Sequence, residues 1–131
     1  MVSWKNGLSG TAALLPLLLW MPGAHAAGNT ALAGNWARDD GQIRMVISPC
    51  GGNFCATNTF VKDPQGKEKV GDELILKLSP VSESVLQGQA YDVRRKMNYK
   101  MTITLQGANM HTSGCVLMGM ICKAAGWTKA N

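Results

Sequence analysis

The chain has 131 residues, with 13 basic and 8 acidic side chains and a formal net charge of +5. This length corresponds to one domain. Apart from Arg94-Arg95-Lys96, the basic residues are scattered and do not alternate with aromatic residues, so we expect no nucleic-acid partner. We expect the basic triplet to lie at a solvated hairpin tip.

The first 26 residues have the pattern of a secretory signal peptide. A basic n-region precedes the apolar stretch 8–21, and Ala24-His25-Ala26 is the small-x-small pattern that signal peptidase accepts. The apolar stretch is shorter than the ~20 residues that span a bilayer, and Pro16 interrupts it, so we favour cleavage over an uncleaved anchor. We therefore expect one domain over residues 27–131, a periplasmic or secreted location, and no stable membrane anchor.

All four cysteines, Cys50, Cys55, Cys115 and Cys122, follow the predicted signal peptide. An even number of cysteines in an exported chain favours disulfides, and the spacing does not suit zinc, so we expect no metal and no cofactor. Each pair flanks a turn, which favours local bridges between Cys50 and Cys55 and between Cys115 and Cys122. Long-range bridges are the alternative. Neither pair has the Cys-x-x-Cys spacing of thiol oxidoreductases, so we expect a structural role.

From residue 31 onward, short runs of alternating apolar and polar residues are separated by turn residues, a pattern typical of all-β proteins. The sequence predicts strands at residues 32–38, 43–49, 54–61, 73–78, 85–93, 98–105, 110–117 and 121–129. The segment 73–78 fits either a strand or a helical turn, and we favour the strand. About eight strands with short connections hide their edges if they close into a small antiparallel up-and-down β-barrel. A two-layer sandwich is the alternative.

Two tryptophans lie near the two ends of the predicted domain. Trp36 is on the first predicted strand, and Trp127 is on the last, followed by Lys129. In a closed barrel these strands are neighbours, so we expect Trp36, Trp127 and Lys129 to have structural roles. An indole would pack across the barrel floor, and the lysine would lie over its ring.

The interior of an eight-stranded barrel is either filled by side chains or holds one small ligand. Our candidate ligand-binding residues are Met45, Tyr91, Tyr99 and Met101, because adaptable methionine side chains suit an irregular ligand. Ordinary core filling is the alternative for the methionines.

Catalytic groups are scarce in this sequence. It contains no Gly-x-Ser-x-Gly, His-Glu-x-x-His or phosphate-loop motif, so we expect a protein that is not an enzyme, with no catalytic residues. A hydrolase would require Tyr91, Asp92 or His111 to converge in one cleft.

Several segments resemble a bacterial family known as domain of unknown function 2147. They are residues 47–55 (ISPCGGNFC), 61–64 (VKDP), Tyr91-Asp92, 114–122 (GCVLMGMIC) and 127–129 (WTK). The resemblance covers nearly all of the chain beyond residue 26. It implies an exported, lipocalin-like (calycin-like) barrel with no established activity. The family usually has glycine near Lys96 and arginine in place of Lys129.

Our leading hypothesis is a periplasmic binding module for a small apolar or amphipathic molecule, held inside the barrel or at its mouth. The alternative is a protein for envelope interaction or maintenance that acts through its outer surface, with no internal ligand. An exposed apolar patch would favour this alternative. The sequence identifies no protein partner.

Overall fold

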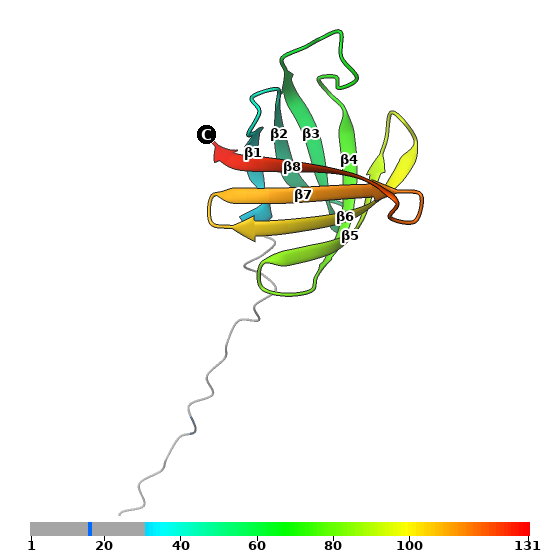
Figure 1. The fold of residues 1–131 in the computed structure, drawn as a ribbon. Helices are drawn as coiled ribbons and strands as arrows, with labels where there is room; N and C mark the ends of the chain where they lie inside the picture. The colour runs from blue at the N-terminus through cyan, green and yellow to red at the C-terminus, as the bar shows by residue number, and fades with distance from the viewer. Residues whose placement is uncertain (1–15, 17–30) are drawn as a thin grey trace, which may run out of the picture.

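The computed structural model describes Pro16 and residues 31–131. The strands in chain order are β1 (Gly34–Arg38), β2 (Ile43–Cys50), β3 (Asn53–Val61), β4 (Glu73–Pro80), β5 (Val85–Asp92), β6 (Met97–Gln106), β7 (Asn109–Val116) and β8 (Ile121–Ala130). Each strand pairs antiparallel with the next, and β1 pairs with β8, so the sheet is a closed barrel (Figure 1). The predicted eight-stranded antiparallel barrel is confirmed, and the sandwich alternative is wrong.

The observed strands match the predicted ones closely. The segment that began at residue 73 is a strand, β4, and not a helical turn. The first strand differs, because Ala31 and Leu32 form a helical turn and β1 begins only at Gly34. The predicted signal peptide lies outside the described residues, apart from Pro16. No helix within the described residues is long and apolar enough to cross a bilayer.

Apolar residues at every second position face the inside of the barrel. On β2, Ile43, Met45 and Ile47 are buried. On β6, the same holds for Met101, Ile103 and Leu105. Successive side chains of a strand point to opposite faces, so this spacing places one face of each strand inside the barrel.

One end of the barrel is closed by Trp36. Its side chain is fully buried, and its Nε1 donates a hydrogen bond to the carbonyl oxygen of Leu32 at 2.9 Å. The Lys129 ammonium lies 4.7 Å from the centre of the indole ring. It also donates hydrogen bonds to the carbonyl oxygens of Ala31, at 3.1 Å, and Ala33, at 2.7 Å. The predicted packing of a lysine over a floor tryptophan is therefore present.

Gly34 is required by this closure. Its φ is +132°, and a Cβ at this position would lie 2.9 Å from Cε of Lys129. Glycine is the only residue without a Cβ and adopts positive φ readily. The glycine that precedes Trp36 therefore leaves room for the lysine that covers the ring.

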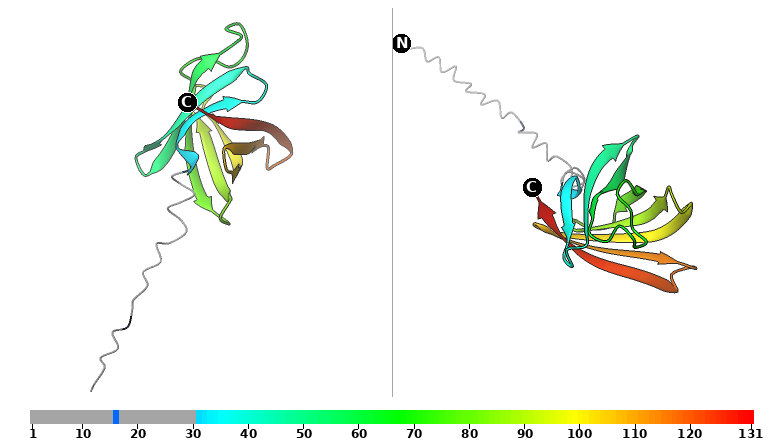
Figure 2. Two further views of the ribbon diagram at one scale, coloured as in Figure 1. Left: turned by 90° about the vertical axis from the view of Figure 1, so that its left-hand side faces the viewer. Right: turned by 90° about the horizontal axis from the view of Figure 1, so that it is seen from above.

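The opposite end of the barrel is the open end. It is formed by the β1–β2 turn, the loop of residues 62–72, the β5–β6 turn and the β7–β8 hairpin. Figure 2 (right) shows the β5–β6 and β7–β8 hairpins, in yellow and orange to red, reaching in the same direction, away from the C-terminus. The positions of these four connections decide what surrounds the mouth of the barrel.

Replacing Lys129 tests the closure. We expect Lys129→Ala to lower the free energy of unfolding by about 1–2 kcal/mol, because it removes the contact with the indole and two charge-assisted hydrogen bonds. Lys129→Arg keeps the positive charge and should lower the free energy of unfolding by less. The matched control is Lys77→Ala, at an exposed position of β4. Urea denaturation measures the free energy of unfolding of all three variants. An equal decrease for Lys129→Ala and Lys77→Ala would contradict the proposed role of Lys129.

Candidate ligand-binding site

A cavity of about 310 Å³ opens inside the barrel. Its apolar lining includes Ile43, Met45, Leu74, Tyr99, Met101 and Trp127. Charged residues also border it, among them Arg38, Lys67, Glu68, Asp72, Arg95 and Lys123. The charged residues come from the connections at the open end and from the strand ends next to them, whereas the apolar residues come from the strands. The cavity therefore combines an apolar interior with a charged rim.

The cavity has room because small residues face it from three strands. Ala56 of β3, Gly114 of β7 and Ala125 of β8 all line it. Larger side chains at these inward positions would fill the space that is open here. The hollow is thus a property of residue size at particular inward positions.

Three of the four candidate ligand-binding residues, Met45, Tyr99 and Met101, line this cavity. Tyr91 does not line it. It lies on β5 between Ala90 and Asp92, which are both buried, so its side chain faces the outside of the barrel. The structure therefore does not bring Tyr91 to this cavity, because the strand alternation puts its side chain on the other face.

Trp127 has two roles in the structure. It is buried in the core, as expected for a structural residue, and it also lines the cavity. Its Nε1 donates a hydrogen bond to Oγ1 of Thr112 at 3.0 Å, which fixes the indole against β7. The two tryptophans are thus separated in function: Trp36 forms the floor, and Trp127 forms part of the wall.

Asp92 is a buried carboxylate at the rim, with an exposed fraction of 3%. The backbone nitrogen of Arg95 donates to its Oδ1 at 2.9 Å, and Nη1 of Arg95 donates to its Oδ2 at 2.8 Å. A buried charge requires such partners. The hydrogen bond to Asp92 raises the pKa of the Arg95 guanidinium above its usual value. Of Tyr91, Asp92 and His111, only Asp92 lines the cavity.

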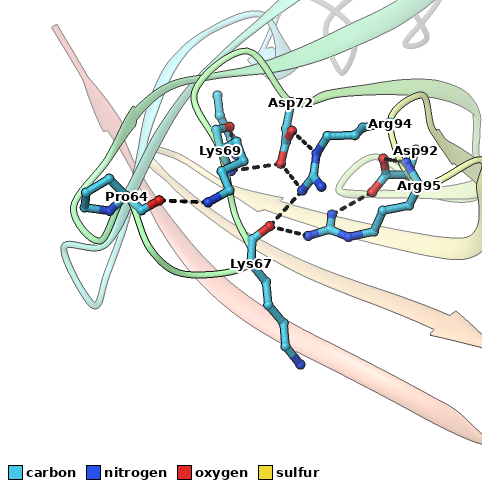
Figure 3. Close-up of polar contacts among 8 residues, drawn as sticks. Pro64, Lys67, Lys69, Asp72, Asp92, Arg94 and Arg95 are labelled. Carbon is cyan, nitrogen blue, oxygen red and sulfur yellow. Dashed lines mark hydrogen bonds and ion pairs between the residues drawn. The ribbon is translucent and has the colours of Figure 1, made fainter.

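Arg94 and Arg95 together hold the loop of residues 62–72, and we call this pair the arginine latch. Nε and Nη2 of Arg94 donate to the two carboxylate oxygens of Asp72 at 2.6 and 2.9 Å (Figure 3). Both guanidinium groups also donate to the carbonyl oxygen of Lys67 at 2.7 Å. The β5–β6 turn is thereby tied to the loop that borders the mouth.

The loop is also attached to β3. The backbone nitrogen of Asn58 donates to the carbonyl oxygen of Asp72, and the nitrogen of Gly71 donates to that of Asn58, both at 2.9 Å. Within the loop, the Lys69 ammonium donates to the carbonyl oxygen of Pro64 at 2.7 Å. The loop therefore has a defined conformation at the rim.

Comparison with known families identifies the chain. Residues 34–129 match the model of a family described as "Uncharacterized protein conserved in bacteria (DUF2147)". The chain belongs to the DUF2147 family. The match extends from the first residue of β1 almost to the end of β8, so it covers the whole barrel. The family resemblance found in the sequence is confirmed.

Comparison with solved structures supports the barrel fold and says nothing about function. No curated protein matches this DUF2147 chain. A redesigned β-barrel of known structure is similar to it, with a TM-score of 0.50 and 15% sequence identity, over 79% of this chain and 95% of the other. At that identity the likeness concerns architecture and not activity.

The arginine latch adds to one expectation about this DUF2147 protein. The triplet at residues 94–96 lies in the β5–β6 turn, with Arg94 and Lys96 exposed, as predicted. The sequence did not predict that Arg94 and Arg95 form ion pairs. A lone aspartate inside a strand, Asp92, was the sequence signal that a nearby cation would be needed.

The two disulfides have the local pairing that was predicted. Cys50 is bonded to Cys55 across the β2–β3 turn, and Cys115 is bonded to Cys122 at the base of the β7–β8 turn. Disulfides persist in oxidising compartments and are rare in the cytosol. The two bonds therefore indicate that this DUF2147 protein is not cytoplasmic.

Breaking the arginine latch should loosen the loop. The Asp72 side chain is only 11% exposed, but that of Arg94 is 45% exposed, so Asp72→Asn weakens a bidentate pair that water partly screens. We expect the free energy of unfolding to fall by no more than about 1 kcal/mol. We also expect faster tryptic cleavage after Lys62, Lys67 and Lys69. Glu83→Gln, an exposed position in the β4–β5 turn, is the matched control. Unchanged cleavage of Asp72→Asn would refute the latch.

The same pair predicts a pH dependence. The hydrogen bond from Arg94 holds the pKa of the Asp72 carboxyl below its usual value of 3.8. Because the folded state lowers this pKa, the stabilisation is complete above about pH 4 and is lost as the pH falls through the folded value. The stability difference between the wild type and Asp72→Asn should therefore be largest near about pH 6 and shrink below about pH 4. Urea denaturation at several pH values measures it, and a constant difference would count against the pair.

Proposed function

We propose that this protein is an exported binding module for a small amphipathic molecule, and that it acts by binding and not by catalysis. The observation that carries the proposal is the cavity of about 310 Å³, which has an apolar interior and a charged rim. Ligand pockets are typically mostly apolar, with a few polar groups that fix orientation, and this cavity is at the small end of their usual range.

The chemistry of the lining supports an amphipathic ligand over a fully polar one. Met45 and Met101 offer flexible, polarisable surface deep in the cavity, and Trp127 offers a flat apolar wall. Among the described residues the Lys67 ammonium has no ion-pair partner, and Figure 3 shows its side chain extending away from the arginine latch. A polar head group could contact it at the rim while an apolar portion fills the interior.

A periplasmic location fits this proposal. It is supported by the two disulfides and by the signal-peptide pattern of residues 1–26. In that compartment a closed barrel can shield an apolar molecule from water, which is the physical benefit of a hollow interior.

Filling the cavity tests the proposal directly. Ala125 lines the cavity, whereas its neighbour Ala124 is exposed on the outside of β8. With dodecanoate as the amphipathic probe, we expect Ala125→Leu to weaken binding at least tenfold in isothermal titration calorimetry, because the added side chain takes the ligand's space. The matched control Ala124→Leu should bind like the wild type.

Two results would oppose the proposal. One is equal dodecanoate affinity for Ala125→Leu and Ala124→Leu, which would place the probe outside the barrel. The other is native mass spectrometry that finds no small molecule retained by the protein from expressing cells, together with no measurable dodecanoate binding.

A further inference from the structure

We propose that the open end of the barrel docks on an anionic lipid bilayer, with the β7–β8 turn inserted among the lipids. We call residues 117–121, which are this turn and the first residue of β8, the apolar tip. Its four large side chains, Leu117, Met118, Met120 and Ile121, are all exposed. Met118 is fully exposed and Met120 is 84% exposed. Exposed apolar groups concentrated at one point indicate an interaction site.

The backbone of the apolar tip is unusual for these residues. Leu117 and Met118 have φ values of 53° and 57°, in the left-handed region that favours glycine and asparagine. Polar turn residues would adopt this conformation more easily and would also be better solvated. The Cys115–Cys122 disulfide closes the base of the turn. The hairpin therefore holds large apolar side chains outward at a position where glycine or asparagine would cost less.

Exposed apolar side chains are concentrated at the open end as a whole. Of the nine large hydrophobic residues that are exposed in the described part of the chain, only Val81 lies at the closed end. Val93 and Met97 flank the β5–β6 turn, beside the apolar tip. This asymmetry means that one end of the barrel faces an apolar environment and the other faces water.

Charge selects an anionic partner. No aspartate or glutamate occurs after Asp92. Residues 93–131 carry six basic side chains, of which Arg94 and Arg95 are paired with aspartates and Lys129 lies at the closed end. The basic residues near the apolar tip are therefore Lys96, Lys100 and Lys123. Lys100 lies opposite Cys115 in the sheet register. Lys123, one residue beyond Cys122, is 80% exposed, and its only ion-pair contact among the described residues is a long one of 3.8 Å to Glu68. Lysines therefore flank the base of the apolar tip, where lipid head groups would lie. Basic residues near a bilayer are attracted to anionic lipids.

The small area of the apolar tip favours a bilayer over a protein as its partner. Four apolar side chains bury on the order of 400 Å² between them. A stable protein complex buries about 800 Å² on each partner. A narrow tip flanked by cations instead suits shallow insertion into the boundary between head groups and acyl chains, where peripheral proteins place apolar residues.

The docking brings the mouth of the cavity to the lipid surface. Lys123 belongs both to the rim of the cavity and to the base of the apolar tip. An amphipathic ligand could then pass between bilayer and barrel without crossing water. The docking itself does not require the cavity to bind anything, so the two proposals can fail separately.

An inserted fluorophore tests the docking. The full chain carrying Met118→Trp is mixed with vesicles of phosphatidylglycerol that contain brominated lipid, and its emission is compared with that of the wild type. We expect a blue shift and strong bromine quenching of the added indole. The matched control is Val81→Trp, which places an exposed indole at the closed end and should show neither change. Because both variants share residues 1–30, any contribution of that segment is the same in both.

Two further measurements define the partner. The double variant Met118→Ser/Met120→Ser should sediment with phosphatidylglycerol vesicles roughly tenfold less than Val81→Ser, because it removes two apolar groups from the lipid contact. Binding should also fall steeply with added salt and with phosphatidylcholine in place of phosphatidylglycerol. Both serine variants should unfold like the wild type, since the positions are exposed.

Several results would overturn the docking proposal. One is equal quenching of the indoles introduced by Met118→Trp and Val81→Trp. Another is vesicle binding that is unaffected by the double serine variant. A third is a protein dimer, detected by sedimentation, that the double serine variant abolishes, because this would make a second copy the occupant of the apolar tip. Ala125→Leu should leave vesicle binding unchanged, so a failure of ligand binding would be seen separately.

Discussion

The structure depends on the pairing of β1 with β8. Only four residue pairs join these strands, from Asn35 with Ala130 to Arg38 with Trp127. The same short seam holds the contact of Lys129 with the Trp36 ring, and the lysine also binds the helical turn that precedes β1. The β1–β8 strand pairing, the contact of Lys129 with the Trp36 ring and the hydrogen bonds from Lys129 to carbonyl oxygens therefore all lie at this seam. Without this closure the sheet would have two free edges and no enclosed interior.

The closure also explains why the barrel is filled at one end and hollow at the other. Trp36 and Leu32 fill the closed end completely. Toward the open end the inward positions carry Ala56, Gly114 and Ala125, and these small residues leave the cavity open. The hollow borders charged connections because loops, and not strands, surround the mouth. An apolar interior beneath a charged rim is the arrangement that our proposed function requires.

The open end carries two different devices. On one side the arginine latch ties the β5–β6 turn to the loop of residues 62–72 through the Asp72 carboxylate and the Lys67 carbonyl oxygen. On the other side the β7–β8 hairpin extends past the end of β1, with a disulfide at the base of its turn and no acidic residue along its length. The arginine latch consists of charged groups that are paired with one another, whereas the apolar tip consists of apolar side chains that are exposed to water. Our two proposals rest on this difference, since the first can shape a mouth and the second can enter a lipid surface.

The sequence by itself predicted the strands, and it favoured the barrel and the local disulfide pairs over their alternatives. Period-two alternation, as in residues 98–105, reports which face of a strand is buried, and closely spaced cysteines around a turn meet across a hairpin. It also predicted the packing of Lys129 over Trp36, because the first and last strands of a barrel must be neighbours. These features are local, or follow from closure alone.

Only the tertiary structure decided the site. Tyr91 faces outward, Trp127 lines the cavity, and Arg94 reaches Asp72, which lies 22 positions earlier in the chain. Contacts between loops depend on where the barrel places their ends, and no period in the sequence reports that placement. The size of the cavity likewise depends on which small residues face one another across the barrel, which is set by register between strands and not by any one segment.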